Sequence, residues 1–67
     1  MARRTTYRVW TVVYPDPLEH TGFGVAHFDN AAEAQDFGVV HRAIRILDEV
    51  VPARIANRWT FTRWGRP

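Results

Sequence analysis

Histidine is the residue type in this sequence best suited to bind a metal or act as a general base. It occurs three times, as His20, His27 and His41. No two of these have the His-Glu-x-x-His spacing of a zinc enzyme. If a helix packed over a strand, His27 and His41 would approach each other and Asp48. A compact enzyme or a histidine metal site is therefore one hypothesis, the third of the three considered for this chain.

Nucleophilic side chains are scarce. The sequence has no cysteine and no serine, which leaves threonine as the usual nucleophile. Without cysteine there is no disulfide, no cysteine-bound zinc and no iron–sulfur cluster. Gly22 and Gly24 stand at the start of a predicted strand, where glycine favours close packing or a bulge over phosphate binding. We therefore expect no catalytic residues, no cofactor and no metal.

Arginine and tryptophan suggest a second kind of chemistry. The nine basic residues are all arginine, and the net charge is +2. Single-stranded nucleic acids bind to surfaces that combine arginine with aromatic residues, because bases stack on the rings and guanidinium groups contact phosphates. The alternative hypothesis is therefore a small DNA- or RNA-binding protein. The residues that would contact the nucleic acid are Arg3, Arg4, Arg8, Arg58 and Arg63, with Trp10 and Trp64.

The elements that would position these residues follow from composition and periodicity. Residues 5–14 are rich in β-branched and aromatic side chains, which predicts a first strand that ends at Pro15. Residues 22–28 alternate small and large side chains and predict a second strand. Asn30 and Glu33 have the spacing of a helix capping box, so we expect a helix over 31–50, with Pro52 as its stop. Residues 53–64 predict a third strand.

This order of elements, β-β-α-β, predicts an α+β fold. The simplest sheet has three antiparallel strands in the order 2-1-3, with the helix packed on one face. A chain of 67 residues allows one domain, which we expect to span residues 1–67 with short basic tails at 1–4 and 65–67. The lack of cysteine and of a long apolar run favours a cytoplasmic location and no membrane segment.

The predicted helix is apolar over about half of its circumference, more than one small sheet covers. One stripe of Phe37, Val40, Ile44, Leu47 and Val51 would face the sheet. A second stripe would be covered by the loop over 15–21 and the long aromatic side chains, or it would meet a copy of itself in a two-fold dimer or a partner protein. The predicted dimer interface consists of Val39, Ala43, Ile46 and Val50.

The sheet face opposite the helix is expected to stay open. Residues 7–14 are apolar on both sides, so the pattern leaves undecided which side faces the helix. We assign Arg8, Trp10, Val12 and Tyr14 to the open face, together with alternate residues of the third strand. Tryptophan, tyrosine and arginine are enriched at protein interfaces. The predicted partner-binding residues are Trp10, Tyr14, Arg58 and Trp64.

A resemblance points in the same direction. The segment from Phe28 to Phe37 follows an aromatic strand, and it stands in a chain whose basic residues are all arginine. In these features the sequence resembles small accessory proteins of actinobacterial phages. The resemblance implies a non-catalytic role, in which the protein binds, blocks or retunes a host factor. We therefore predict a homodimeric, macromolecule-binding module whose partner is a host or cellular protein.

Overall fold

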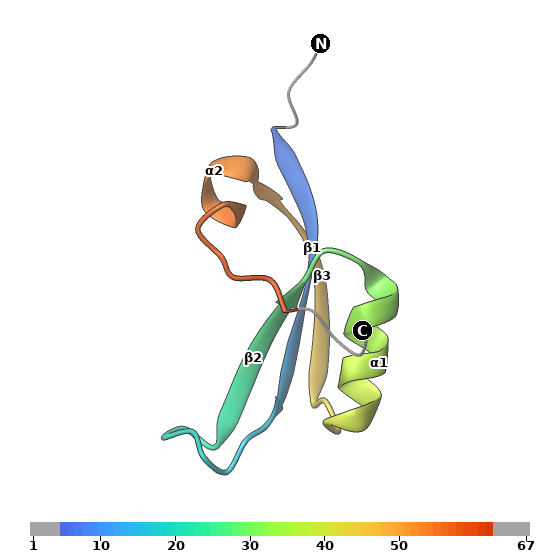
Figure 1. Ribbon diagram of the computed structural model, residues 1–67, viewed down its shortest axis with the longest axis vertical. Coiled ribbons are helices and arrows are strands. Elements are labelled where there is room, and N and C mark those ends of the chain that lie inside the picture. Colours follow the sequence, from blue (N-terminus) through green and yellow to red (C-terminus); the bar gives the residue numbers. More distant parts are fainter. Residues whose placement is uncertain (1–4, 63–67) are drawn as a thin grey trace.

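Three strands form one antiparallel sheet in the order β2-β1-β3, with a helix packed on it (Figure 1). The computed structural model describes residues 5–62. The elements in this range are β1 (Thr6–Pro15), β2 (Phe23–Phe28), α1 (Ala31–Val40), β3 (Arg45–Pro52) and α2 (Ala53–Ala56). The predicted α+β fold and the 2-1-3 strand order are thus confirmed. Within the described range no helix has the length and apolar character needed to cross a membrane.

Each strand residue can be assigned to one face of the sheet from whether its number is even or odd. Val12 pairs with Ala26 on one side and with Ile46 on the other, so even-numbered residues of all three strands share a face. We call this side the even face and the opposite side the odd face. Because β1 is flanked on both edges and apolar on both faces, it can be buried along its middle.

The even face is covered by α1. Val12 and Phe28 have no exposed surface, and they form a core cluster with Ala26, Ala34 and Phe37. Trp10 and Tyr14 pack half-buried at the border of this cluster. The expectation that Arg8, Trp10, Val12 and Tyr14 would form the open face is therefore wrong, because these even-numbered residues lie on the side that α1 covers.

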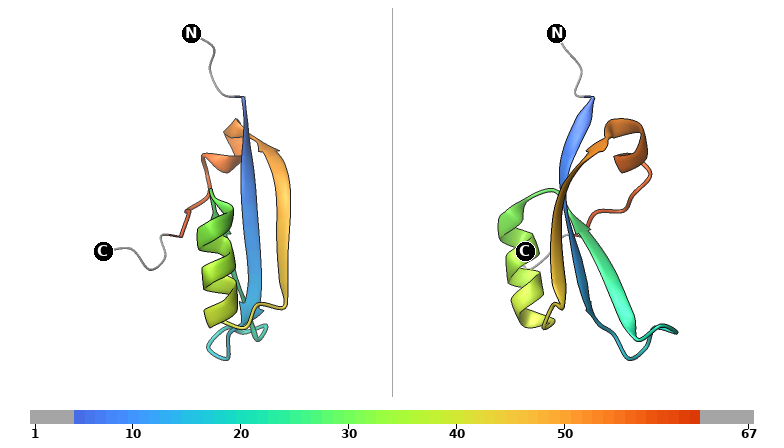
Figure 2. Two further views of the ribbon diagram at one scale, coloured as in Figure 1. Left: turned by 90° about the vertical axis from the view of Figure 1, so that its right-hand side faces the viewer. Right: turned by 180° about the vertical axis from the view of Figure 1, so that it is seen from behind.

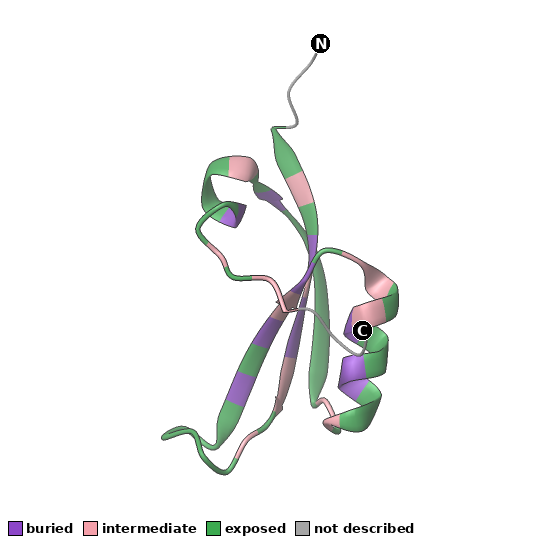
Figure 3. Cartoon of the chain, in the orientation of Figure 1, coloured by how far each residue is buried: buried purple, intermediate pink, exposed green. Residues whose placement is uncertain are grey.

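The odd face is covered in part by the segment that follows β3. Val9, Val51 and Ala56 form a second buried cluster, with Tyr7, Trp59 and Phe61 packed against it. The two helices consequently lie on opposite sides of the strands (Figure 1). Farther along the odd face, Phe23 and Val25 stay exposed. Figure 3 shows this division, with buried segments in the middle of β1 and β2 and exposed colour along most of β3.

Helix α1 begins where the sequence predicts and ends ten residues earlier. The side chain of Asn30 accepts a hydrogen bond of 2.8 Å from the Glu33 N–H, which confirms the predicted cap. The helix ends at Val40, and Arg42 then adopts a positive φ of 56°, which reverses the chain. Such a left-handed residue is costly without glycine, so the tertiary contacts on either side must hold it.

The predicted helix over 41–50 is wrong, since residues Arg45–Pro52 form β3. The sequence there has apolar residues at spacings that suit a helix, but its β-branched residues, Ile46, Val50 and Val51, also suit a strand. Pairing with β1 favours the strand over the helix. The main-chain N–H and C=O groups of the odd-numbered β1 residues need partners on the side where β3 lies. Pro52 ends the strand and not a helix.

The predicted third strand over 53–64 is also wrong. Its first residues form the short helix α2, and a single parallel bridge joins Phe61 to His27 at the outer edge of β2. Ala53 donates a hydrogen bond to the Thr5 carbonyl, which anchors the start of α2 beside β1. The third strand of the topology is therefore supplied by residues that the sequence pattern assigned to the helix.

Candidate interaction surface

Exposed apolar side chains are concentrated in one stretch of the chain. Of the ten large apolar side chains exposed in the described range, six belong to residues 39–50. Val39 is the most exposed of these six, at 80%, and Val50 is exposed at 63%. Isolated apolar residues on a surface are ordinary, whereas a contiguous group marks an interaction site.

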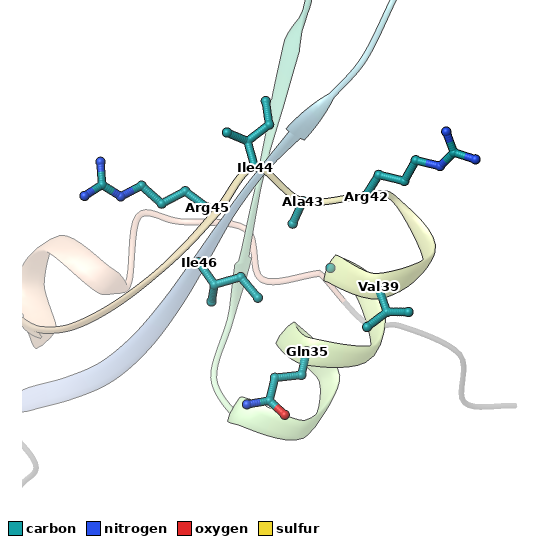
Figure 4. Close-up of a pocket in the computed structure, with 8 residues that line it drawn as sticks. Gln35, Val39, Arg42, Ala43, Ile44, Arg45 and Ile46 are labelled. Carbon is teal, nitrogen blue, oxygen red and sulfur yellow. The ribbon is translucent and has the colours of Figure 1, made fainter.

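Part of this group borders a groove of about 550 Å³ between α1 and the start of β3. Figure 4 shows the groove from the side of α1, with Val39 and Gln35 on the helix and Ile46 on the strand. The guanidinium groups of Arg42 and Arg45 point outward on either side. The lining residues are Gln35, Gly38, Val39, Arg42, Ala43, Ile44, Arg45 and Ile46.

Gly38, which lines the groove, lets the helix approach β3 closely. A Cβ atom at Gly38 would lie 3.0 Å from the Ile46 Cδ1 atom and 3.3 Å from the Ala43 Cβ atom. Glycine inside a helix costs roughly 1 kcal/mol relative to alanine. Here the glycine makes room for Ile46, whose side chain then forms part of the groove.

The outer edge of β3 adjoins this groove. Ala53 bonds to Thr5, and the register places odd-numbered residues of β3 in hydrogen-bonded pairs with β1. The main-chain groups of Ile46, Asp48 and Val50 therefore point away from β1. Figure 2 (left) shows β3 at the border of the molecule, on the side away from α1. Across residues 5–62 no strand pairs with this edge.

The residues of the predicted dimer interface lie on this side of the molecule, although not on one helix. Val39 belongs to the last turn of α1, Ala43 to the connection, and Ile46 and Val50 to β3. The predicted helical stripe is thus wrong, because the chain turns at Arg42. Three of its members, Val39, Ala43 and Ile46, still meet around the groove.

The predicted partner-binding residues occupy different surroundings. Trp10 and Tyr14 pack at the border of the even-face core, and Arg58 follows α2, whose Ala56 packs on the odd face. Trp64 lies outside the described residues. The structure therefore does not bring Trp10, Tyr14 and Arg58 together on one open sheet face.

The arginines of the nucleic-acid hypothesis are partly engaged. Arg8 donates hydrogen bonds of 2.9 Å and 2.8 Å to the two carboxylate oxygens of Asp48, and it lies over the Trp10 ring. This pairing lowers the pKa of Asp48 and raises that of Arg8. Arg58 is exposed and lines a hollow of about 320 Å³ with Arg54 and Ile55. Arg3, Arg4 and Arg63 lie outside the described residues.

The histidines are not assembled into a common site. His41 stacks on Phe37 on the α1 side, with ring centroids 3.8 Å apart. His27 lies on the odd face, where its ring stacks on Trp59 at 4.3 Å. The expected approach of His27 to His41 and Asp48 is therefore wrong. In the part of the chain that the structure describes, no group of three or more potential ligands could hold a metal ion.

We expect His27 to make stability depend on pH. Burial lowers its pKa below the ordinary value of 6.5, an effect that the charge of Glu49 opposes. The unfolded chain then binds more protons than the folded chain just below that value. The contribution of His27 to the free energy of unfolding should therefore be fully present above about pH 6.5. It should decline as the pH falls, until the imidazole of the folded protein is also protonated.

Urea unfolding of the wild type and of His27→Gln, at about pH 7.5 and about pH 5, measures this effect. The variant should lose less stability between the two values than the wild type does. His20→Gln, a matched change in an exposed loop, should retain the wild-type difference. Equal losses in the wild type and in His27→Gln would contradict the assignment.

Comparison of the chain with protein-family models, curated proteins and solved structures finds no match. The function is therefore inferred from the surface itself. Sequence patterns missed Gln35, Arg42 and Arg45 as members of the groove. No local signal reveals the two arginines, because charged and apolar residues do not alternate in the segment Arg-Ala-Ile-Arg-Ile.

Proposed function

We propose that this protein is a small non-catalytic module that binds another protein through the groove between α1 and β3. The observation that carries the proposal is a groove lined by three exposed large apolar side chains, Val39, Ile44 and Ile46. Protein interfaces combine such an apolar centre with a polar rim. Here Val39 and Ile46 would contact an apolar side chain of the partner, and Arg42 would meet a carboxylate at the rim.

The electrostatics favour a protein partner over a nucleic acid. The net charge is only +2, and Arg8 is neutralised by Asp48. A site with an arginine beside apolar walls suits an acidic and apolar peptide segment better than a run of phosphates. Binding of DNA or RNA, through Arg58 and the other arginines, is the alternative proposal.

Affinity capture from the native host tests the proposal with two matched variants. Val39→Gln keeps the net charge and suits a helix, but it removes an apolar contact of the groove. Loss of one such buried contact is worth about 1.5 kcal/mol, so we expect retention of the partner to weaken about tenfold. Leu18→Gln makes the same kind of change at a loop residue that is 94% exposed.

The expected result is a protein retained by the wild type and by Leu18→Gln but weakly by Val39→Gln. Equal retention by all three proteins would contradict a role for the groove. If capture disappears after nuclease treatment, or if labelled oligonucleotides bind in a salt-dependent way that Arg58→Ala abolishes, the nucleic-acid alternative is correct instead.

A further inference from the structure

We propose that the outer edge of β3 pairs with the same edge of a second copy, antiparallel, with Leu47 on the two-fold axis. This inference stands on the main chain of β3 and does not depend on what the groove binds. The two outer edges of the sheet differ in their hydrogen bonding. At the outer edge of β2, the Thr62 N–H donates a hydrogen bond to the His27 carbonyl. At the outer edge of β3, no strand is paired among the described residues.

β3 has few of the features that protect an edge strand. It has eight residues, and its only proline is its last residue. Edge strands avoid pairing through inward charges, bulges, lysines or proline within the strand. The one charge that β3 places on the even face, Asp48, is held by Arg8 of its own chain. Ile46 and Val50 are then left as exposed apolar neighbours on that face.

The direction of the main-chain groups permits only some registers. Even-numbered residues of β3 point their N–H and C=O groups outward, so even residues of one copy must pair with even residues of the other. With Leu47 on the axis, Ile46 pairs with Asp48 of the second copy and exchanges both hydrogen bonds. The same pair recurs on the other side of the axis by symmetry.

The charges select this register. With Leu47 on the axis, Arg45 lies opposite Glu49 of the second copy, and the two-fold axis repeats this pair. Both residues are exposed, and neither forms an ion pair with another residue between 5 and 62. An axis at Asp48 or at Glu49 would place two carboxylates opposite each other, and an axis at Ile46 would lose the Arg45–Glu49 pairing.

The resulting dimer is one continuous sheet with both α1 helices on the same face. The two even faces adjoin at β3, so the grooves of the two copies lie on either side of the axis. Leu47, exposed on the odd face of each copy, meets its own equivalent. The homodimer predicted from the sequence is thus proposed to form through a strand edge and not through a helix stripe.

Charge reversal tests the pairing. Arg45→Glu places like charges opposite each other at both symmetric positions, and so does Glu49→Arg. We expect each single variant to raise the dimer dissociation constant at least tenfold, measured by sedimentation equilibrium. The double variant Arg45→Glu with Glu49→Arg should restore dimerisation, while circular dichroism confirms that all three remain folded. A double variant as weak as the single variants would overturn the charge pairing.

A cysteine scan tests the register, because the chain has no cysteine of its own. Leu47→Cys places two thiols on the axis at a non-hydrogen-bonded pair, with Cα atoms about 4.5 Å apart, within the range of a disulfide. Glu49→Cys separates the two thiols by about 13 Å along the strands. We expect oxidation to link Leu47→Cys and to leave Glu49→Cys unlinked. A wild type that stays monomeric at high concentration, or preferential linkage of Glu49→Cys, would overturn the proposal.

Discussion

Phe28→Ala is expected to lower the free energy of unfolding by about 3–5 kcal/mol. The Phe28 side chain is fully buried beneath α1, and its ring lies 5.2 Å from that of Phe37. Its loss removes apolar contacts and leaves a cavity that the short strands cannot close. A domain of this length has a total stability of roughly 3–10 kcal/mol. The variant should therefore be largely unfolded or close to it.

Circular dichroism and urea unfolding measure this loss. Phe23→Ala is the matched control, because it makes the same substitution on the same strand. Phe23 is 51% exposed on the odd face, so its replacement should change stability by less than about 1 kcal/mol. Similar unfolding curves for the two variants would show that the core does not lie between α1 and the even face.

Gly24→Ala is expected to cost about 1–3 kcal/mol, although alanine normally suits a strand better than glycine. A Cβ atom at Gly24 would lie 2.5–2.8 Å from atoms of the Tyr14 ring, closer than atoms can approach. Tyr14 lies directly across the strand pair and packs edge-on against Phe37, with ring centroids 5.0 Å apart. The ring would have to leave this position.

A double-mutant cycle isolates that cause. In a Tyr14→Val background the obstructing ring is absent, so Gly24→Ala should become neutral or slightly stabilising, measured by urea unfolding. An equal cost in both backgrounds would mean that the strain lies in the main chain. Tyr14 also contacts His41 at the end of α1. Its displacement in Gly24→Ala should therefore loosen the helix end that carries Val39, with weaker capture of the partner.

The candidate surface was only partly predictable. The sequence pointed to Val39, Ala43, Ile46 and Val50 as an apolar stripe at a dimer interface, and the structure places three of them around one groove. The sequence did not indicate that β3 is an edge strand, because this depends on which strands pair in the folded sheet. The prediction for Trp10 and Tyr14 depended on which face of β1 the helix covers, and β1 is apolar on both faces.

Local signals were sufficient for the first half of the chain. β-branched and aromatic residues stopped by proline specify β1, and the Asn30 side chain specifies the start of α1. Each of these depends on residues a few positions apart, so the sequence contains the whole cause. The order of the strands followed from the same elements and from the short connections between them.

Residues 41–62 were decided by contacts between distant parts of the chain. Thr6 pairs with Pro52, and Val13 pairs with Arg45, so β3 depends on main-chain groups more than thirty residues away. The apolar spacing of 45–52 suits a helix, and the unsatisfied edge of β1 favours the strand. Local propensity does not include this contribution, because it depends on the position of β1 at the centre of the sheet.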